Sequence, residues 1–334
     1  MLNYGHKGGS MRMRLGSLTT ASVAVAALGL LSTVGCGKVG QLKAAKSFKE
    51  ANAAYQQQDY KKAADLYEQT IAADPTDFGT AYFFLGNSYD NLYKPSRKGE
   101  AANDELLTKA VANYELAAEK LSAEKPDEAK IKKLSLEYLV ASYGPDKLND
   151  ASKAEPVVIH MIQLDPGDPA NYFQLGKIYE DAGLYDEAEK VYLMAKQAKP
   201  SDPDVYMQLA GFYNRTGEFD KTIGALQERA DREPNNPEAF YTISTYYWDK
   251  AYRDFRLKDT EKKDMVQKGI AAVDKALQIK PDYVEALVYK NLLLRLEANL
   301  SKDPKEQQDL IKQADQLRDK AQELRKAKTA GTGE

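Results

Sequence analysis

The chain states one pattern twice in succession between residues 169 and 236. Residues 169–202 read PANYFQLGKIYEDAGLYDEAEKVYLMAKQAKPSD, and residues 203–236 read PDVYMQLAGFYNRTGEFDKTIGALQERADREPNN. A period of 34 residues is typical of helical repeats in which each unit packs on its neighbours. Equivalent positions of the two copies hold Tyr172 and Tyr206, Leu175 and Leu209, Gly176 and Ala210, Tyr179 and Tyr213, Gly183 and Gly217, Tyr185 and Phe219, and Pro200 and Pro234.

The small and helix-ending residues of the pattern predict a helix-turn-helix unit. A small residue at Gly176 or Ala210 allows two helices to approach closely, while neighbouring aromatics fill the space around it. Gly183 and Gly217 suit the left-handed conformation in which many helices end. Proline then stops the second helix of each copy.

The first copy resembles the tetratricopeptide repeat (TPR) family, whose motif it carries at Tyr172, Leu175, Gly176, Tyr179, Gly183, Tyr185, Ala188, Tyr192, Ala195 and Pro200. The resemblance implies an all-α solenoid, a right-handed superhelix of helix-turn-helix units. The second copy departs from the family at Thr222, Leu226 and Arg229, so we expect its second helix to pack less ideally.

The same register extends the array to about seven units over residues 44–327. The units fall at about 44–77, 79–125, 135–168, 169–202, 203–236, 237–282 and 283–327, followed by a disordered tail at 328–334. Charged insertions lengthen the second unit near 94–104 and the sixth near 251–264. An apolar stripe from Leu310 to Leu324 on a charged helix predicts a C-terminal cap.

Residues 1–35 resemble a bacterial lipoprotein signal, with basic residues at Lys7, Arg12 and Arg14 ahead of the uncharged stretch 15–34. Cys36 follows Ser-Thr-Val-Gly and is the expected lipidation site, with 36–43 as a short linker. The resemblance implies an exported lipoprotein, anchored in the periplasm or at the outer membrane. The alternative is an uncleaved N-terminal anchor with an unmodified thiol.

The composition disfavours nucleic-acid binding, metal binding and catalysis. The chain has 47 basic and 50 acidic residues. The signal segment, residues 1–35, contains basic residues and no acidic one, so the rest of the chain is net acidic. Nucleic-acid binding would require a basic face. One cysteine and two histidines exclude an internal disulfide and offer little for a metal site or a cofactor. His160 is a lone histidine without ligand neighbours, and no nucleophile or phosphate-loop motif occurs, so we expect no enzyme.

The TPR resemblance implies a binding groove lined by the first helix of each unit. The residues placed there are Phe48, Asn52, Phe83, Asn87, Phe173, Lys177, Met207, Gly211, Tyr241 and Thr245, with Asp90, Asn214 and Trp248 one turn further on. Aromatic and amide side chains of this kind suit a segment of a partner protein. The alternative is that the phenylalanines pack between adjacent helices.

These observations predict a non-catalytic protein-interaction scaffold of the bacterial cell envelope. Two alternatives stay open at this point. The groove aromatics Tyr241 and Trp248 also suit a small ligand or a glycan, and an adaptor held by an uncleaved N-terminal anchor would share the same repeats.

Overall fold

The computed structural model describes the backbone of residues 22–330 and the side chains of residues 38–328. Over this range the fold is all-α: fourteen α-helices and one short 3-10 helix, η1, with no strand. The predicted all-α fold of helix-turn-helix units is confirmed. The chain divides into two compact units, residues 1–150 and 151–334, which are described separately.

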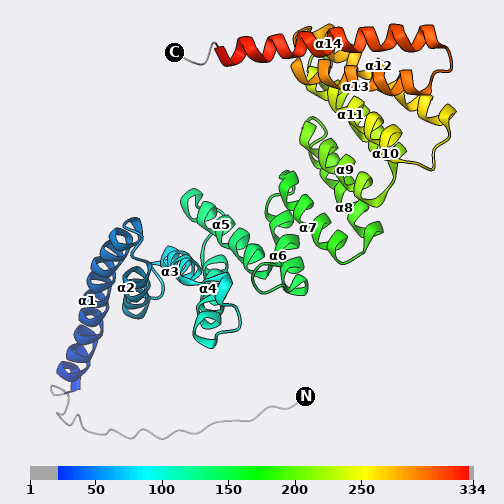
Figure 1. Cartoon of the computed structure of the whole chain (residues 1–334). Helices are drawn as coiled ribbons and strands as arrows, with labels where there is room; N and C mark the ends of the chain where they lie inside the picture. Colours follow the sequence, from blue (N-terminus) through cyan, green and yellow to red (C-terminus); the bar gives the residue numbers. More distant parts are fainter. Residues whose placement is uncertain (1–21, 331–334) are drawn as a thin grey trace, which may run out of the picture. The chain divides into compact units, whose positions relative to one another are not determined.

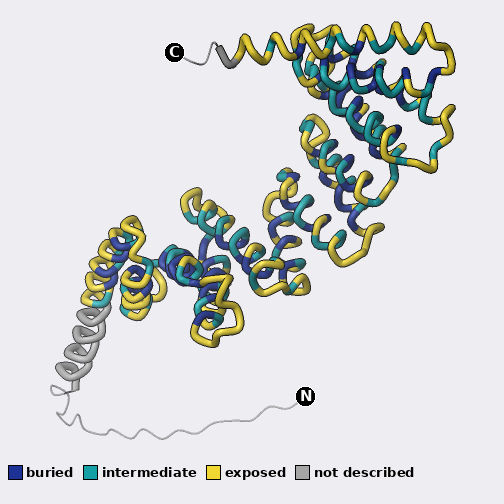
Figure 2. Tube along the Cα trace, viewed as in Figure 1, coloured by how far each residue is buried: buried dark blue, intermediate teal, exposed yellow. Residues whose placement is uncertain are grey.

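Unit 1 contains five α-helices, each packed against the next along the chain (Figure 1). They are α1 (Ser22–Gln56), α2 (Tyr60–Ala73), α3 (Gly79–Leu92), α4 (Ala101–Lys120) and α5 (Pro126–Tyr143), with η1 (Pro95–Arg97) between α3 and α4. Buried side chains lie along the faces where these helices meet, and exposed residues line the outer turns (Figure 2).

Unit 2 continues the same construction over nine α-helices, again with each helix packed on its successor. They are α6 (Ala151–Leu164), α7 (Pro169–Asp181), α8 (Tyr185–Ala198), α9 (Pro203–Thr216), α10 (Phe219–Arg232), α11 (Pro237–Arg253), α12 (Asp259–Ile279), α13 (Val284–Leu300) and α14 (Pro304–Ala330). α14 lies against α13 and buries Ala314 and Ala321, which fits the predicted terminal cap.

Three first helices of unit 2 start in the same way. α7, α9 and α11 begin at a proline preceded by a capping residue: Asp168, Asp202 or Asn236. Each capping side chain accepts a hydrogen bond from the backbone N–H two residues on, at 3.0 Å. Proline suits this first position because its missing N–H would have no helical partner there.

The recurring tyrosines are explained by two recurring hydrogen bonds. Tyr172 and Tyr206 donate to the carbonyls of Pro166 and Pro200, at 3.0 and 2.8 Å, and so tie each first helix to the loop before it. Tyr179 and Tyr213 donate to carboxylates of the preceding second helix, Glu155 and Glu189, at 2.8 Å. Buried hydroxyls need such partners, and the period therefore preserves tyrosine rather than phenylalanine here.

Glycine allows close packing or a left-handed turn at the predicted places. A Cβ at Gly176 would lie 2.9 Å from the Tyr192 ring, so the close approach is to a side chain. Gly183 and Gly217 have φ angles of +74° and +83°, the left-handed conformation expected at the ends of α7 and α9.

The structure corrects the expectation of a short linker at 36–43, because these residues lie inside α1. The helix already contacts the end of α2 and the loop after it: a Cβ on Gly40 would meet the Ala73 carbonyl at 3.0 Å, and Gln41 Nε2 donates to Asp77, in the loop before α3, at 2.8 Å. The packed part of the helix therefore begins ahead of the expected start at 44.

The third predicted repeat, 135–168, also differs. Its first helix, α5, begins earlier, at Pro126, and belongs to unit 1, whereas its second helix, α6, belongs to unit 2. Pro126 at the first position and two acidic residues in the first turn account for the early start.

The expectation of looser packing in α10 is wrong. Thr222, Leu226 and Arg229 are all buried. The Thr222 hydroxyl donates to the Glu218 carbonyl at 3.1 Å, and Arg229 donates to Glu233 and to the Met207 sulfur. Thr222 and Arg229 stand where the family usually has alanine, and their polar groups are satisfied by these hydrogen bonds although both side chains are buried.

The signal segment and the lipidation site fall largely outside the described residues: nothing is described of residues 1–21, nor of the Cys36 side chain. The tail expected at 328–334 is described only as far as Ala330, in α14. Over the described range, no helix has both the length and the apolar character required to span a bilayer.

Candidate functional site

A pocket of about 270 Å³ is lined by residues of three first helices of unit 2. α9, α11 and α13 all contribute to it, and we call it the groove pocket. Its lining contains three of the residues predicted from sequence, Asn214, Thr245 and Trp248, together with Tyr246, Asp249, Arg253 and Tyr289.

The amphipathic character of α11 positions most of these side chains. Ala239, Phe240, Ile243 and Ser244 are buried, which fixes the rotation of the helix. Residues three and four positions apart share a helix face, so Tyr241, Thr245, Trp248 and Tyr252 follow one another along a second face. The core packing of α11 therefore determines which side chains reach the groove pocket.

Aromatic rings from α11 and α13 form one wall of the pocket. Trp248 lies edge-to-face with Tyr289, with ring centroids 5.7 Å apart and planes inclined by 79°. Tyr289 in turn meets the predicted groove residue Tyr241, which lies outside the pocket lining, edge-to-face at 5.3 Å, and Tyr241 meets Tyr283 at the same distance. Burial raises the pKa of Tyr241 to about 12, so its hydroxyl stays neutral at physiological pH.

Polar groups of the groove pocket offer hydrogen bonds to a ligand. Asn214 is exposed on α9, and its amide can both donate and accept. Thr245 donates its hydroxyl proton to the Thr242 carbonyl at 2.7 Å, which leaves oxygen lone pairs as acceptors. Asp249 pairs with Arg253 Nε at 2.8 Å on the same helix, and both side chains are half-exposed or more.

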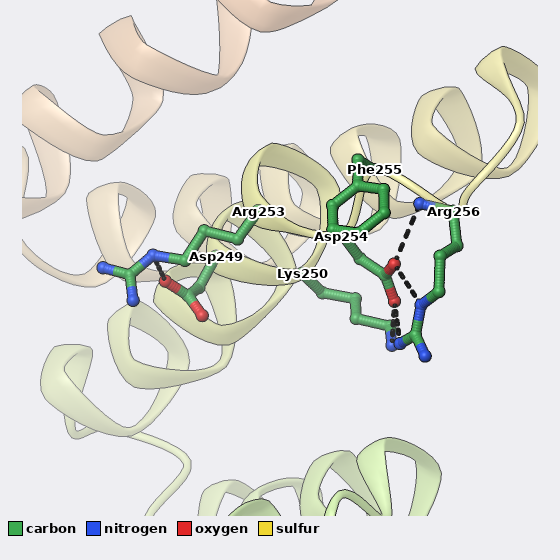
Figure 3. Close-up of a pocket in the computed structure, with 6 residues that line it drawn as sticks. All are labelled: Asp249, Lys250, Arg253, Asp254, Phe255 and Arg256. Atoms are coloured by element: carbon green, nitrogen blue, oxygen red, sulfur yellow. Dashed lines mark hydrogen bonds and ion pairs between the residues drawn. The ribbon is translucent and has the colours of Figure 1, made fainter.

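A second pocket, of about 420 Å³, adjoins the turn between α11 and α12, residues 254–258. We call this turn the elbow and its hollow the elbow pocket. Asp249, Lys250, Arg253, Asp254, Phe255 and Arg256 line it (Figure 3). Asp254 accepts hydrogen bonds from Lys250 and from two nitrogens of Arg256, each at 2.9 Å. These cations, Arg256 first, hold the pKa of Asp254 well below its usual range.

The predicted groove residues of α7 and α9 lie outside both pockets, with the exception of Asn214. Phe173 packs beside Tyr192, with ring centroids 6.4 Å apart. Lys177 pairs with Asp181, and the Met207 sulfur accepts from Arg229 at 2.9 Å. Gly211 leaves room that the Arg215 guanidinium approaches.

Arg215 joins α9 to α7 through Glu180. Its Nε and Nη2 donate to the two Glu180 oxygens at 2.6 and 2.9 Å. The hydrogen bonds from Arg215 are the main cause of the lowered pKa of Glu180. The pair therefore stays ionised at neutral pH and ties two first helices together.

In unit 1 the predicted groove residues engage internal partners. Phe48 packs against Phe78 and Tyr67, and Asn52 accepts from the Tyr67 hydroxyl at 2.7 Å. Phe83 is buried against Tyr114 and Tyr138. This matches the alternative in which the phenylalanines pack between helices.

The polar members of that set are likewise hydrogen-bonded within unit 1. Asn87, only 3% exposed, accepts from Tyr55 at 2.6 Å and donates to Tyr114 at 3.3 Å. Asp90 accepts from Lys147 at 2.5 Å. These contacts stabilise the interior of unit 1, so unit 2 provides the more open candidate surface.

Four residues of the groove pocket were not predicted: Tyr246, Asp249, Arg253 and Tyr289. Asp249 directly follows Trp248, so the set of predicted groove positions would have included Asp249 if it had been extended by one residue. Arg253 lies one turn beyond, in the extended end of α11. Tyr289 belongs to α13, where the repeat pattern is too degenerate to set a register.

The pocket chemistry suits recognition of a ligand. Aromatic faces, an amide and an ion pair converge, and among the described residues no three His, Cys, Asp or Glu side chains are grouped to hold a metal ion. Such surfaces bind by burial of aromatic area and by hydrogen bonds to a peptide backbone.

Comparisons with known proteins agree with the repeat fold. Two family models described as tetratricopeptide repeat match residues 48–119 and 147–207. A comparison with curated proteins found no match. The crystal structure of the C-terminal part of a TPR repeat-containing protein from Cytophaga hutchinsonii is 16% identical, with a TM-score of 0.52, over 83% of this chain and 98% of that one.

Two further solved structures are similar over part of the chain. MamA is 20% identical over 55% of this chain and 92% of its own, with a TM-score of 0.37. YrrB, a TPR protein with an unusual peptide-binding site, is 19% identical over 59% and 89%, with a TM-score of 0.37. The chain thus contains tetratricopeptide repeats, at residues 48–119 and 147–207, within an all-α fold.

Proposed function

We propose that the protein is a non-catalytic scaffold that holds an extended segment of a partner protein in the groove pocket of unit 2. The observation that carries this proposal is the convergence of α9, α11 and α13 on one open pocket lined by Asn214, Trp248 and Tyr289. Three repeats contribute to it, so a bound segment would run across successive first helices.

The groove pocket contains its own spectroscopic reporter, because Trp248 is the single tryptophan of the chain. Random dodecapeptides displayed on phage can be selected on the purified full chain, and the recovered sequences synthesised with a fluorescent label. We expect a recovered peptide to change the emission of Trp248 and to lose about tenfold or more in affinity with Trp248→Ala, as for a central aromatic contact.

Tyr185→Ala is the matched control, since it removes an exposed aromatic side chain at the start of α8, away from the pocket. Its affinity for the peptide should equal that of the wild type. Recovery of no peptide, or of peptides that bind Trp248→Ala as well as wild type, would overturn the proposal.

A second candidate ligand is a glycan. Tyr252 stacks on Trp248 and is 63% exposed, so an aromatic face is available to the apolar side of a sugar ring. Titration with linear oligosaccharides of glucose or N-acetylglucosamine, without any peptide, tests it. Saturable quenching of Trp248 supports the glycan function, whereas unchanged emission contradicts it.

We further propose that the scaffold acts at the bacterial cell envelope, exported and anchored through a lipid on Cys36. The support comes from the sequence, in which a basic segment and an uncharged stretch precede Ser-Thr-Val-Gly-Cys. Mass spectrometry of the protein from its native host is decisive. A diacylglyceryl group on an N-terminal Cys36 supports the anchor, and an intact N-terminus starting at Met1, Met11 or Met13 favours the uncleaved alternative.

A further inference from the structure

The elbow presents an aromatic ring to solvent at the end of α11. Phe255 is 88% exposed, the highest value among the large apolar side chains described. A single exposed ring is ordinary on a protein surface, so Phe255 points to a site only together with the charged side chains around it. The elbow also exists only because the sixth repeat is longer than its neighbours, so the core of the solenoid does not require it.

Charges at the elbow are arranged in layers. Asp254 is only 11% exposed and lies beneath Arg256, which is 75% exposed. Arg253 is 73% exposed, and it contacts Asp249 through Nε. Each guanidinium carries five N–H donors, so both arginines retain donors for a further acceptor. The outer surface of the elbow is therefore cationic and aromatic, although acidic residues lie within it.

The elbow pocket and the groove pocket share two of their lining residues. Asp249 and Arg253 line both of them. Figure 3 shows these two side chains extending to one side of the elbow, while Lys250 and Arg256 gather around Asp254 on the other side, with Phe255 next to Asp254. A segment leaving the groove pocket would therefore have to cross the end of α11 over Arg253 to reach Phe255 and Arg256.

We propose that the elbow pocket is a second subsite for the same partner segment, and that it binds an acidic side chain next to an apolar one. The carboxylate pairs with the guanidinium group of Arg256, and the apolar side chain packs on Phe255. Arginine suits this role because its planar fork matches a carboxylate. The inference rests on the proposed function, which supplies the segment in the groove pocket.

A peptide carboxylate fits this site better than an anionic membrane. The site is a shallow pocket in which the carboxylates of Asp249 and Asp254 lie among the cations, so a broad anionic surface would also meet like charges. A single carboxylate can reach Arg256 without facing those acids, and a segment held in the groove pocket can supply it, whereas a bilayer has no link to the groove pocket.

The test uses a peptide recovered by phage selection on the full chain, so the probe is a defined sequence. We expect recovered peptides to contain Asp or Glu next to an aromatic or aliphatic residue. Arg256→Gln leaves the groove pocket untouched and should weaken binding about tenfold, as should replacing the acid of the peptide by its amide. The two changes together should cost no more than either alone, because both remove the same contact.

Lys263→Gln is the matched control, since it removes the same charge from α12 outside both pockets. It should leave the affinity unchanged. A thermal melt checks that Arg256→Gln remains folded, and Lys250 still pairs with Asp254 in that variant.

The outcomes separate this inference from the proposed function. Peptides that depend on Trp248 but tolerate Arg256→Gln, or that lack acids, would overturn the acidic subsite alone. Peptides indifferent to Trp248 overturn the groove pocket. The last measurement is sedimentation of the protein with vesicles of phosphatidylcholine and phosphatidylglycerol. If the wild type sediments with the vesicles, Phe255→Ala does not, and the recovered peptides show no preference for acidic residues, the elbow binds a membrane and the subsite is overturned.

Discussion

The indole of Trp248 stacks on the ring of Tyr252, one turn further along α11, with ring centroids 4.9 Å apart and planes inclined by only 10°. Tyr252 is mostly exposed, so it covers one face of the indole while Tyr289 meets its edge from α13. The pocket side of Trp248 is thereby held in place before any ligand arrives, which lowers the ordering cost of binding.

Replacing Tyr252 by leucine should expose one face of Trp248 to water. We expect a red shift of the Trp248 emission, with a loss of stability of about 0.5 kcal/mol, the low end for an aromatic pair because Tyr252 lies at the surface. Fluorescence spectra and thermal melts measure both. Tyr185→Leu, on α8, should change neither, and an unshifted emission in Tyr252→Leu would mean that the stack does not persist in solution.

The packing of Gly176 gives a sharper test of the repeat core. A Cβ at this position would lie 2.9 Å from the Tyr192 ring, which is buried and hydrogen-bonded to Glu180. Gly176→Ala should therefore destabilise the protein by about 1–3 kcal/mol through overpacking. Urea denaturation followed by circular dichroism measures the change.

Gly224 is the matched control for Gly176, because it lies within α10 and a Cβ added to it would meet no atom within 4 Å. Gly224→Ala should stabilise the protein by about 0.5–1 kcal/mol, since alanine has the higher helix propensity. Two alanine substitutions of opposite sign would locate the effect in the contact with Tyr192. Equal effects would contradict it.

The sequence was informative wherever a residue has one physical role. Gly183 and Gly217 were predicted to end helices in the left-handed conformation, and both do. The start of α5 at Pro126 was missed, because the third repeat lacks the motif residues that set the register elsewhere. Residues 36–43 are helical and contact the end of α2 and the following loop through Gly40 and Gln41, which no local pattern reveals.

The candidate site was predictable only in part, and the reason is visible at two asparagines. Asn87 and Asn214 both lie on first helices, one turn apart in the repeat register, yet Asn87 is buried between tyrosine hydroxyls and Asn214 is exposed in the groove pocket. A buried hydrogen-bonded amide and a ligand-facing amide are identical in sequence. The difference arises from Tyr55 and Tyr114, which only the fold brings to Asn87.

The ion pair between Arg215 and Glu180 predicts a pH dependence of stability. Arg215 lowers the folded-state pKa of Glu180, so the unfolded chain takes up the proton first as the solution is acidified. The contribution is complete above the ordinary glutamate pKa of about 4.3 and is lost as the pH falls through the lower folded value. Arg215→Gln should cost on the order of 1 kcal/mol at pH 7.

Denaturation of Arg215→Gln and wild type at pH 7 and pH 3 measures this pair. The difference between the two proteins should shrink markedly at pH 3. Lys177→Gln breaks an exposed pair with Asp181 on α7 and should cost under about 0.5 kcal/mol at either pH. If Arg215→Gln lowers the free energy of unfolding by the same amount at both pH values, the stabilisation does not depend on the ionisation of Glu180.

Asn87 allows unit 1 to be destabilised separately. Asn87→Ala leaves the hydroxyls of Tyr55 and Tyr114 without their shared amide, at a cost of about 1–3 kcal/mol for buried polar groups. Circular dichroism reports all helices, whereas Trp248 reports only unit 2. Each repeat contacts only its neighbours, so a loss of stability in unit 1 should affect unit 2 weakly. In Asn87→Ala the circular dichroism transition should therefore begin at lower urea than in the wild type, while the Trp248 transition moves much less. The control is Asn113→Ala, on α4 of the same unit, which should shift neither transition. If the Trp248 transition of Asn87→Ala moves as far as the circular dichroism transition, the two units unfold together.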